Sequence, residues 1–232
     1  MNSAYCGPPP LPSELVTNWN LDPVLLAGLL ALGLVLRRKR FGLAAVAVLA
    51  LAFVSPLCAL SSALFSARVA HHVLLVAVAA PLLGLALPAR RGGGIALPFV
   101  LSTVVLWAWH VPAAYDAALA NVALYWAMQL TLLGSAVLFW RAVLAETRSP
   151  IDRLVFVVAA FAQMGLLGAI LTFASQPLYA AHAMTTVAWG LMPLEDQRLG
   201  GLLMWVPAGI PYAVAAALIA RRGWTRLTGA VA

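Results

Sequence analysis

The sequence has little charge: only 9% of its 232 residues are Asp, Glu, Lys or Arg, whereas 64% are hydrophobic. A water-soluble domain carries about 25% charged residues, so this chain cannot cover its surface for water. Lipid is therefore expected to be its main solvent. The formal net charge of +7 does not indicate a nucleic-acid partner, because the basic residues lie in short loops between apolar runs and form no single basic face.

Cysteine is also scarce. The two cysteines, Cys6 and Cys58, are too few for a disulfide framework, and their spacing matches no zinc motif. The first 20 residues contain several prolines and no positive charge, so they lack the basic start of a cleavable signal peptide. We expect the first apolar run to act as its own insertion signal.

Long apolar runs predict an all-α bundle of about seven transmembrane helices. A helix rises 1.5 Å per residue, so about 20 apolar residues cross a hydrocarbon core of roughly 30 Å. The runs leave no room for a soluble domain, which predicts a single integral membrane domain over residues 1–232. They cover residues 21–36, 41–60, 71–88, 95–112, 122–144, 153–174 and 199–220. Pro207 and Pro211 predict a kink in the outer half of the last run.

The basic residues predict the orientation. With the N-terminus outside and the C-terminus in the cytoplasm, only Arg68 and Arg198 lie on the outer side, as the positive-inside rule requires. The cytoplasmic set is Arg37, Arg38, Lys39, Arg40, Arg90, Arg91, Arg141, Arg148, Arg153, Arg221, Arg222 and Arg226. The outer segments are then the polar stretch 61–70, the link 112–121 and the long loop 175–198.

In this topology all the histidines lie at the outer ends of spans or in an outer loop. They are His71, His72, His110 and His182. A single histidine at the membrane edge is more often a headgroup-level side chain than a ligand, but the clustering favours a shared role. Arg68 and His72 are spaced i, i+4 and share one face if the helix extends outward through residue 68. His110 ends its span just before Pro112, which makes a rigid position for an imidazole.

Imidazole, thiolate and thioether groups together suit a soft metal, copper above all. Zinc also accepts His and Cys, but no zinc spacing is present. Haem would need two imidazoles that face each other across a deep cavity. The predicted metal ligands are His72, His110, His182, Cys58 and Met184, with His71, Cys6, Met204 and Asp116 as auxiliary candidates.

The interiors of the spans lack the charged residues that pumps and proton-coupled transporters need. Their main polar residues, Gln129, Gln163 and Thr172, are expected to form hydrogen bonds between helices. The serines of segment 61–70 have no acid–base partner for nucleophilic catalysis. The chain is therefore predicted not to be an enzyme.

Three segments carry a resemblance to a known family. FSARVAHHVLLVAVAAPLL at 65–83, WHVPAAYDAAL at 109–119 and PLEDQRLGGLLMWVPAG at 193–209 resemble the CtaG family of cytochrome c oxidase assembly factors. The resemblance implies a multi-pass protein of a bacterial inner membrane that acts in the biogenesis of a caa-type haem–copper oxidase. It also implies cytochrome c oxidase subunits and the lipid bilayer as partners, and a copper ion as the ligand.

The family motifs also assign residues. His72 and His110 fall on family histidines, and most of the other matching residues are expected to be architectural. These others are Trp109, Pro112, Asp116, Asp196, Gln197, Gly200, Gly201, Trp205 and Pro207. Many members have a histidine in place of Arg68 and a Glu-His pair in place of Met128-Gln129. These departures favour a metal-free scaffold of an oxidase complex as the alternative hypothesis. The paired histidines leave a haem-binding membrane protein as a further one.

Overall fold

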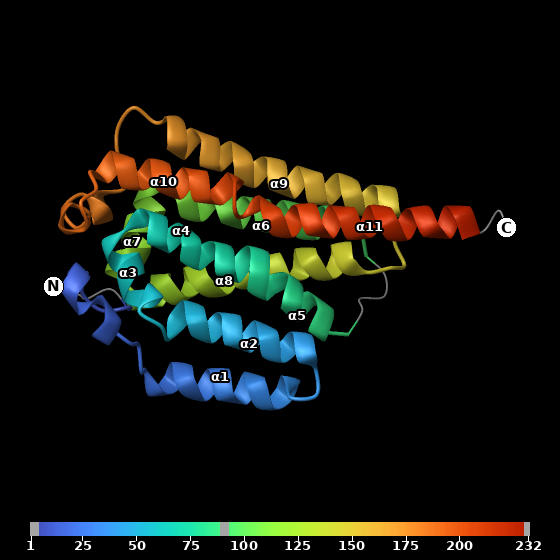
Figure 1. Ribbon diagram of the computed structural model, residues 1–232, viewed down its shortest axis with the longest axis horizontal. Coiled ribbons are helices and arrows are strands. Elements are labelled where there is room, and N and C mark those ends of the chain that lie inside the picture. The colour runs from blue at the N-terminus through green and yellow to red at the C-terminus, as the bar shows by residue number, and fades with distance from the viewer. Residues whose placement is uncertain (1–4, 89–92, 230–232) are drawn as a thin grey trace.

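The computed structural model describes residues 5–88 and 93–229, so the predicted cytoplasmic residues Arg90 and Arg91 lie outside the described residues. Within these two ranges the chain is helical and contains no β-strand, which confirms the predicted all-α class. The helices run roughly along one long axis, with the two termini at opposite ends of the molecule (Figure 1).

Seven of the described helices are longer than nine residues. These are α1 (Pro23–Leu36), α2 (Arg40–Phe53), α6 (Ala96–His110), α8 (Val122–Leu144), α9 (Pro150–Phe173), α10 (Pro193–Trp205) and α11 (Gly209–Gly229). The shorter ones are α3 (Leu57–Ala63), α4 (Phe65–Val73), α5 (Ala80–Ala86) and α7 (Pro112–Ala120). A π-helical segment, Leu74–Ala79, joins α4 to α5.

Several of these helices are long and apolar enough to cross a membrane, which confirms a multi-pass membrane protein. Within the described ranges, four stretches qualify by themselves: Phe65–Ala86, Val122–Leu144, Pro150–Phe173 and Pro193–Thr225. The pair α2 and α3 (bent by 45°) and the pair α6 and α7 (bent by 75°) bring the total to six if each pair is one span. The helix α1 is shorter, so a seventh span and the orientation stay predictions.

The segment 61–70, predicted to be a polar outer stretch, is instead helical and buried. The physical reason is a cap at the start of α4. The carboxylate of Asp196 in α10 accepts hydrogen bonds from the backbone N–H of Phe65 (2.6 Å) and of Ser66 (3.2 Å), and from the Ser66 hydroxyl. An acidic cap satisfies the first free N–H groups of a helix. This apolar helical stretch therefore begins at Phe65, before residue 71, and Arg68 lies inside the bundle.

The last predicted span is interrupted at Pro207, where the sequence predicts a kink. A turn at residues 206–208 separates α10 from α11, which confirms the predicted break at Pro207. Before the break, α10 packs closely on α9. A Cβ atom at Gly201 would collide with the Thr172 hydroxyl and lie 2.5 Å from the Gly168 carbonyl oxygen. The glycine thus permits close helix contact, as is common in membrane bundles.

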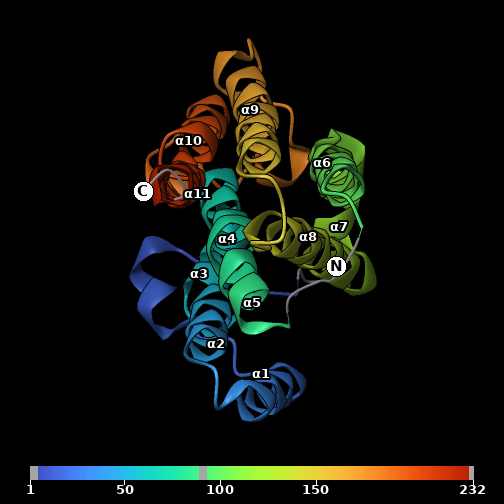
Figure 2. The same cartoon turned by 90° about the vertical axis from the view of Figure 1, so that its right-hand side faces the viewer.

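The run formed by α4 and α5 occupies the centre of the bundle. Viewed along the long axis, it has α2, α8 and α10 around it, and α1 lies at the edge (Figure 2). The link 112–121 between two predicted spans forms the helix α7 (Pro112–Ala120). In the loop after α9, two short 3-10 turns precede α10, which already begins at Pro193.

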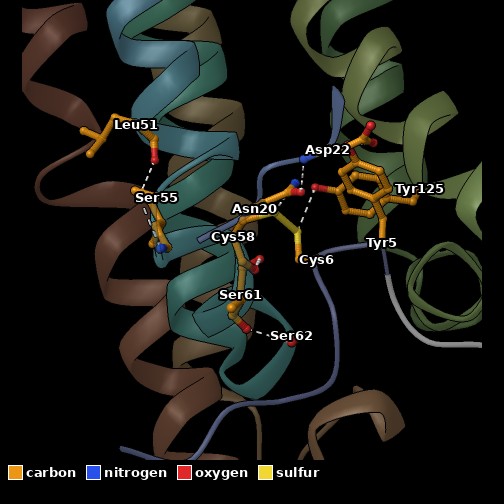
Figure 3. Close-up of a disulfide and its surroundings, with 12 residues drawn as sticks. Tyr5, Cys6, Asn20, Asp22, Leu51, Ser55, Cys58, Ser61, Ser62 and Tyr125 are labelled. Carbon is orange, nitrogen blue, oxygen red and sulfur yellow. Dashed lines mark hydrogen bonds between the residues drawn. A yellow bond between two sulfur atoms is a disulfide. The ribbon is translucent and has the colours of Figure 1, made fainter. Parts of the chain in front are cut away.

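The N-terminal tail is linked covalently to the end of the bundle where α3 lies. A disulfide joins Cys6 to Cys58 in α3, and the Tyr125 hydroxyl of α8 lies 3.3 Å from the Cys6 sulfur (Figure 3). The Tyr5 ring stacks on Tyr125 at 5.0 Å, and its hydroxyl donates a 2.6 Å hydrogen bond to Asp22. The tail thereby links α1, α3 and α8.

Candidate functional site

A small cavity lies beside the central helix, between α4, α6, α9 and α10. Four of its lining side chains carry nitrogen or sulfur donors: His72, His110, Met164 and Met204. The other lining residues are Val69, Val73, Val76, Ala77 and Leu106. The cavity volume is about 20 Å³. A cavity must have a volume of at least roughly 10–15 Å³ to hold a water molecule, so this one has room for one water or one ion.

The two histidines line this region, and they differ in the hydrogen bonding of their ring nitrogens. The Nδ1 atom of His110 lies 2.7 Å from the carbonyl oxygen of Leu106. Because a carbonyl only accepts, Nδ1 carries the hydrogen and Nε2 keeps the lone pair. The Nε2 atom of His72 is buried without a hydrogen-bond partner among the described residues. The two ring centroids are 6.5 Å apart.

The sulfur donors come from the two helices that pack at Gly201. Met204 belongs to α10 and Met164 to α9, and both side chains are buried. Met204 was an auxiliary candidate, whereas sequence reasoning missed Met164. Within an apolar run a methionine resembles any other core residue, so no local signal marks it. Only the contact between α9 and α10 brings its thioether beside the imidazoles.

The structure places His182 in a different environment. Its Nε2 atom lies 2.7 Å from the hydroxyl of Tyr115, and the ring does not line the cavity. Burial of the ring, and secondly the positive charge of Arg68, lower the pKa of His182 to about 4. The imidazole is therefore neutral at physiological pH and acts as a hydrogen-bonding core residue.

The other predicted ligands also lie away from the cavity. Met184 is 88% exposed. Cys6 and Cys58 were predicted as possible thiol ligands, but the structure corrects this because both sulfurs are in one disulfide. The carboxylate of Asp116 accepts hydrogen bonds from the backbone N–H groups of Ala180 and Ala181, so it positions the loop between α9 and α10.

Arg68 is the most unusual side chain near the site. It is fully buried, its guanidinium carbon lies 5.2 Å from the centre of the Tyr125 ring, and no described residue accepts a hydrogen bond from its three side-chain nitrogens. Both ring nitrogens of the neighbouring His71 also lack partners within the described ranges. A positive charge one helical turn from His72 opposes a cation at the cavity.

A site built from harder ligands is not present in the part of the chain that the structure describes. No group of three His, Cys, Asp or Glu side chains there could hold a metal ion. The donor set at the cavity consists of two imidazoles and two thioethers, and thioethers are soft ligands. Any metal bound here would therefore depend on the methionines.

Two residues of the third motif, Gln197 and Asp196, hold α10 against its neighbours. Gln197 accepts a hydrogen bond from the backbone N–H of Leu178 (2.7 Å) and donates one to the carbonyl of Leu171 (3.3 Å). With Asp196 at the start of α4, it ties α10 to both α4 and the end of α9. The expected architectural role of these two residues is consistent with these bonds.

Comparison with known proteins agrees with the motifs. The family model described as cytochrome c oxidase caa3 assembly factor (Caa3_CtaG) matches residues 31–92 and 96–226. No curated protein and no solved structure matches the chain. The matched residues include the central helix, α6, α9 and α10, which supply the donors of the cavity. The chain thus belongs to the family of caa3-type cytochrome c oxidase assembly factors.

Proposed function

We propose that this protein serves the assembly of a caa3-type oxidase by holding one Cu(I) ion at the cavity and releasing it to an oxidase subunit. Family membership supports the assembly role. The observation that carries the metal role is the meeting of two imidazole rings and two thioethers around one cavity of about 20 Å³. Copper is the cargo in this proposal and takes no part in a reaction on the protein.

The size and chemistry of the cavity suit Cu(I). Metal–imidazole nitrogen bonds of about 2.0 Å would put the centroids of two rings on opposite sides of an ion about 6 Å apart. The observed separation of His72 and His110 is 6.5 Å. Thioether ligands favour the soft ion Cu(I), and imidazole is also a suitable ligand for copper. A monovalent ion also costs less to bury among apolar walls than a divalent one, because the desolvation penalty rises with charge.

Arg68 fits a carrier better than a permanent metal site. Its charge, one turn before His72 on α4, lowers the affinity for any cation at the cavity. A protein that passes copper on has to release it. The replacement of a family histidine by Arg68 is therefore consistent with binding that is weak enough for transfer.

A titration of the detergent-purified protein with Cu(I) under reducing conditions, against a coloured Cu(I) chelator, tests the proposal. We expect about one copper per chain, and loss of binding in the His72→Ala/His110→Ala double variant. Met204→Leu and Met164→Leu should each weaken binding about tenfold, because each removes one soft ligand. Met184→Leu is the matched control: this thioether is 88% exposed and away from the cavity.

Two outcomes would overturn the copper proposal. One is no binding by the wild type; the other is undiminished binding by the double-histidine variant. In either case the leading function becomes that of a metal-free scaffold, which the unpaired charge of Arg68 favours. Co-purification with the mature oxidase at fixed stoichiometry, without copper, would support the scaffold.

Haem binding has less support from the geometry. Pockets for organic ligands measure about 300–1,000 Å³, whereas the cavity between His72 and His110 measures about 20 Å³. A porphyrin does not fit between these two rings. A Soret band in the purified protein would contradict this conclusion.

A further inference from the structure

A second and much larger cavity lies at the edge of the bundle, between α1, α2 and α8. It is a groove of about 460 Å³ with mainly apolar walls. The helix α1 lines it with Leu25, Gly28 and Leu29, and α8 lines it with Trp126, Gln129 and Leu133. None of these residues lines the cavity at His72. The groove therefore has no part in the copper proposal.

The amide of Gln129 is the exceptional feature of this groove. The side chain is 1% exposed, and neither its amide nitrogen nor its amide oxygen has a hydrogen-bond partner among the described residues. The sequence predicted that this residue bonds to another helix, and the structure contradicts that expectation. A buried amide without partners costs about 1–3 kcal/mol. A ligand group that accepts from the amide nitrogen, or donates to the amide oxygen, would reduce this cost once the enclosed amide turns toward it.

The depth of Gln129 argues against an ordinary phospholipid tail as the specific occupant. It is the eighth residue of α8, so it lies about 10 Å along the helix from its outer end at 1.5 Å per residue. At that depth a phospholipid presents only methylene groups, which form no hydrogen bond with the amide. The occupant that satisfies Gln129 has to carry an oxygen into the hydrocarbon region.

The aromatic wall beside Gln129 indicates the shape of that occupant. Phe53 and Trp126 both line the groove, and their rings stack with centroids 5.5 Å apart and planes 23° from parallel. Flat aromatic side chains offer stacking or edge contacts to a flat ring. Beyond them, the walls toward Leu32 and Leu133 are aliphatic and suit an apolar tail.

We propose that the groove between α1, α2 and α8 binds a lipid-soluble molecule with a planar, oxygen-bearing ring and an apolar tail, the chemistry of isoprenoid quinones. Gln129 forms the hydrogen bond to the ring oxygen: its amide nitrogen donates to a carbonyl, or its amide oxygen accepts from a hydroxyl. Phe53 and Trp126 contact the ring. The tail lies along α1 toward the bilayer.

Photolabelling tests this proposal. The probe is an azido-ubiquinone with a short isoprenoid tail, added to the purified protein in detergent, with decylubiquinone as the competitor and a phospholipid as the competition control. We expect saturable labelling of peptides from α1 or α8 that decylubiquinone prevents and the phospholipid does not.

Two variants and a matched control sharpen the test. Gly28→Leu should abolish labelling, because its Cβ atom meets nothing within 4 Å and the added side chain projects into free space at the groove. Gly134→Leu on α8 is the control: its Cβ atom is equally free of contacts, but it does not line the groove. Gln129→Leu should weaken the affinity roughly 2- to 10-fold, the value of one hydrogen bond.

Gln129→Leu also guards against misfolding, because it removes an unpaired buried amide and is expected to leave the fold intact. Labelling that is not saturable, or that the phospholipid competes equally, would overturn the proposal and leave the groove as a lipid-filled surface. Equal labelling of the Gly28→Leu and Gly134→Leu proteins would also overturn it. Copper binding should be unchanged in all three variants, so failure of one proposal is distinguishable from failure of the other.

Discussion

Some buried polar side chains of this protein form hydrogen bonds to neighbouring segments, and others have atoms without a hydrogen-bond partner among the described residues. Asp196 and Gln197 bond to backbone groups of neighbouring segments and hold the helices in place. Arg68, the Nε2 atom of His72 and the amide of Gln129 have no such partners among the described residues. Because unpaired buried groups are costly, the second group is where ligands are to be expected.

Replacement of Arg68 by an uncharged residue tests its effect on the cavity. We expect Arg68→Met to raise the affinity for Cu(I) about tenfold, because the substitution removes a buried positive charge that repels the ion at the cavity. The variant should also be more stable by about 1–4 kcal/mol, as when other buried charged groups are replaced by apolar residues. Competition titration and detergent-phase thermal unfolding measure the two effects.

Arg198→Met is the control, because Arg198 is an exposed arginine of α10. It should leave both the copper affinity and the unfolding temperature close to those of the wild type. An Arg68→Met protein with unchanged copper affinity would show that the charge does not act on the cavity.

At the scale of the helices, the sequence predicts much of the fold for a simple reason. Long apolar runs are readable because the bilayer demands them, and prolines mark where they bend or break, as at Pro207. The cap of α4 by Asp196 was not predictable, because it joins residues 130 positions apart. For the same reason the sequence analysis put Arg68 in a polar stretch between two spans, where the structure has it buried in α4, and missed Met164.

The contact between α9 and α10 is expected to depend on Gly201. In Gly201→Ala the new methyl group would meet the backbone of α9, including the Gly168 carbonyl oxygen at 2.5 Å, and backbone cannot move aside cheaply. We expect a loss of about 1–3 kcal/mol in stability and weaker copper binding, since Met204 would shift away from Met164. Chemical unfolding in detergent and the Cu(I) titration check these effects.

Gly165→Ala provides the comparison on the same interface. Its new methyl group would lie 3.8 Å from the nearest atom, the Trp205 Cβ, which is an ordinary contact. This variant should be at least as stable as the wild type, because alanine favours a helix over glycine. If both variants behaved alike, close packing at Gly201 would not be the cause.

At the scale of the whole molecule, the disulfide and the predicted orientation support each other. Disulfides persist on the oxidising side of a membrane, and Cys6 and Cys58 both lie on the outer side in the predicted topology. In membranes from a bacterial host, we expect the wild type to resist thiol-reactive maleimide until it is reduced. The Cys6→Ser/Cys58→Ser protein should lose about 2–4 kcal/mol of stability and still bind copper.

A chain that reacts with maleimide without prior reduction would contradict the disulfide. A double-serine variant that no longer binds Cu(I), although it is folded, would restore the cysteines as ligand candidates. The single variant Cys58→Ser serves as the internal comparison, because it leaves Cys6 unpaired.

The link between Cys6 and Cys58 also imposes an order on biosynthesis. The cysteines are 52 positions apart, and the segment between them contains both α1 and α2. If these helices cross the membrane as predicted, the bond can form only after Cys58 has reached the side of the membrane on which Cys6 lies. Insertion of α1 and α2 then comes before oxidation of the two cysteines. A cell without a thiol oxidase would accumulate an inserted, reduced protein in which no disulfide links the N-terminal tail to α3.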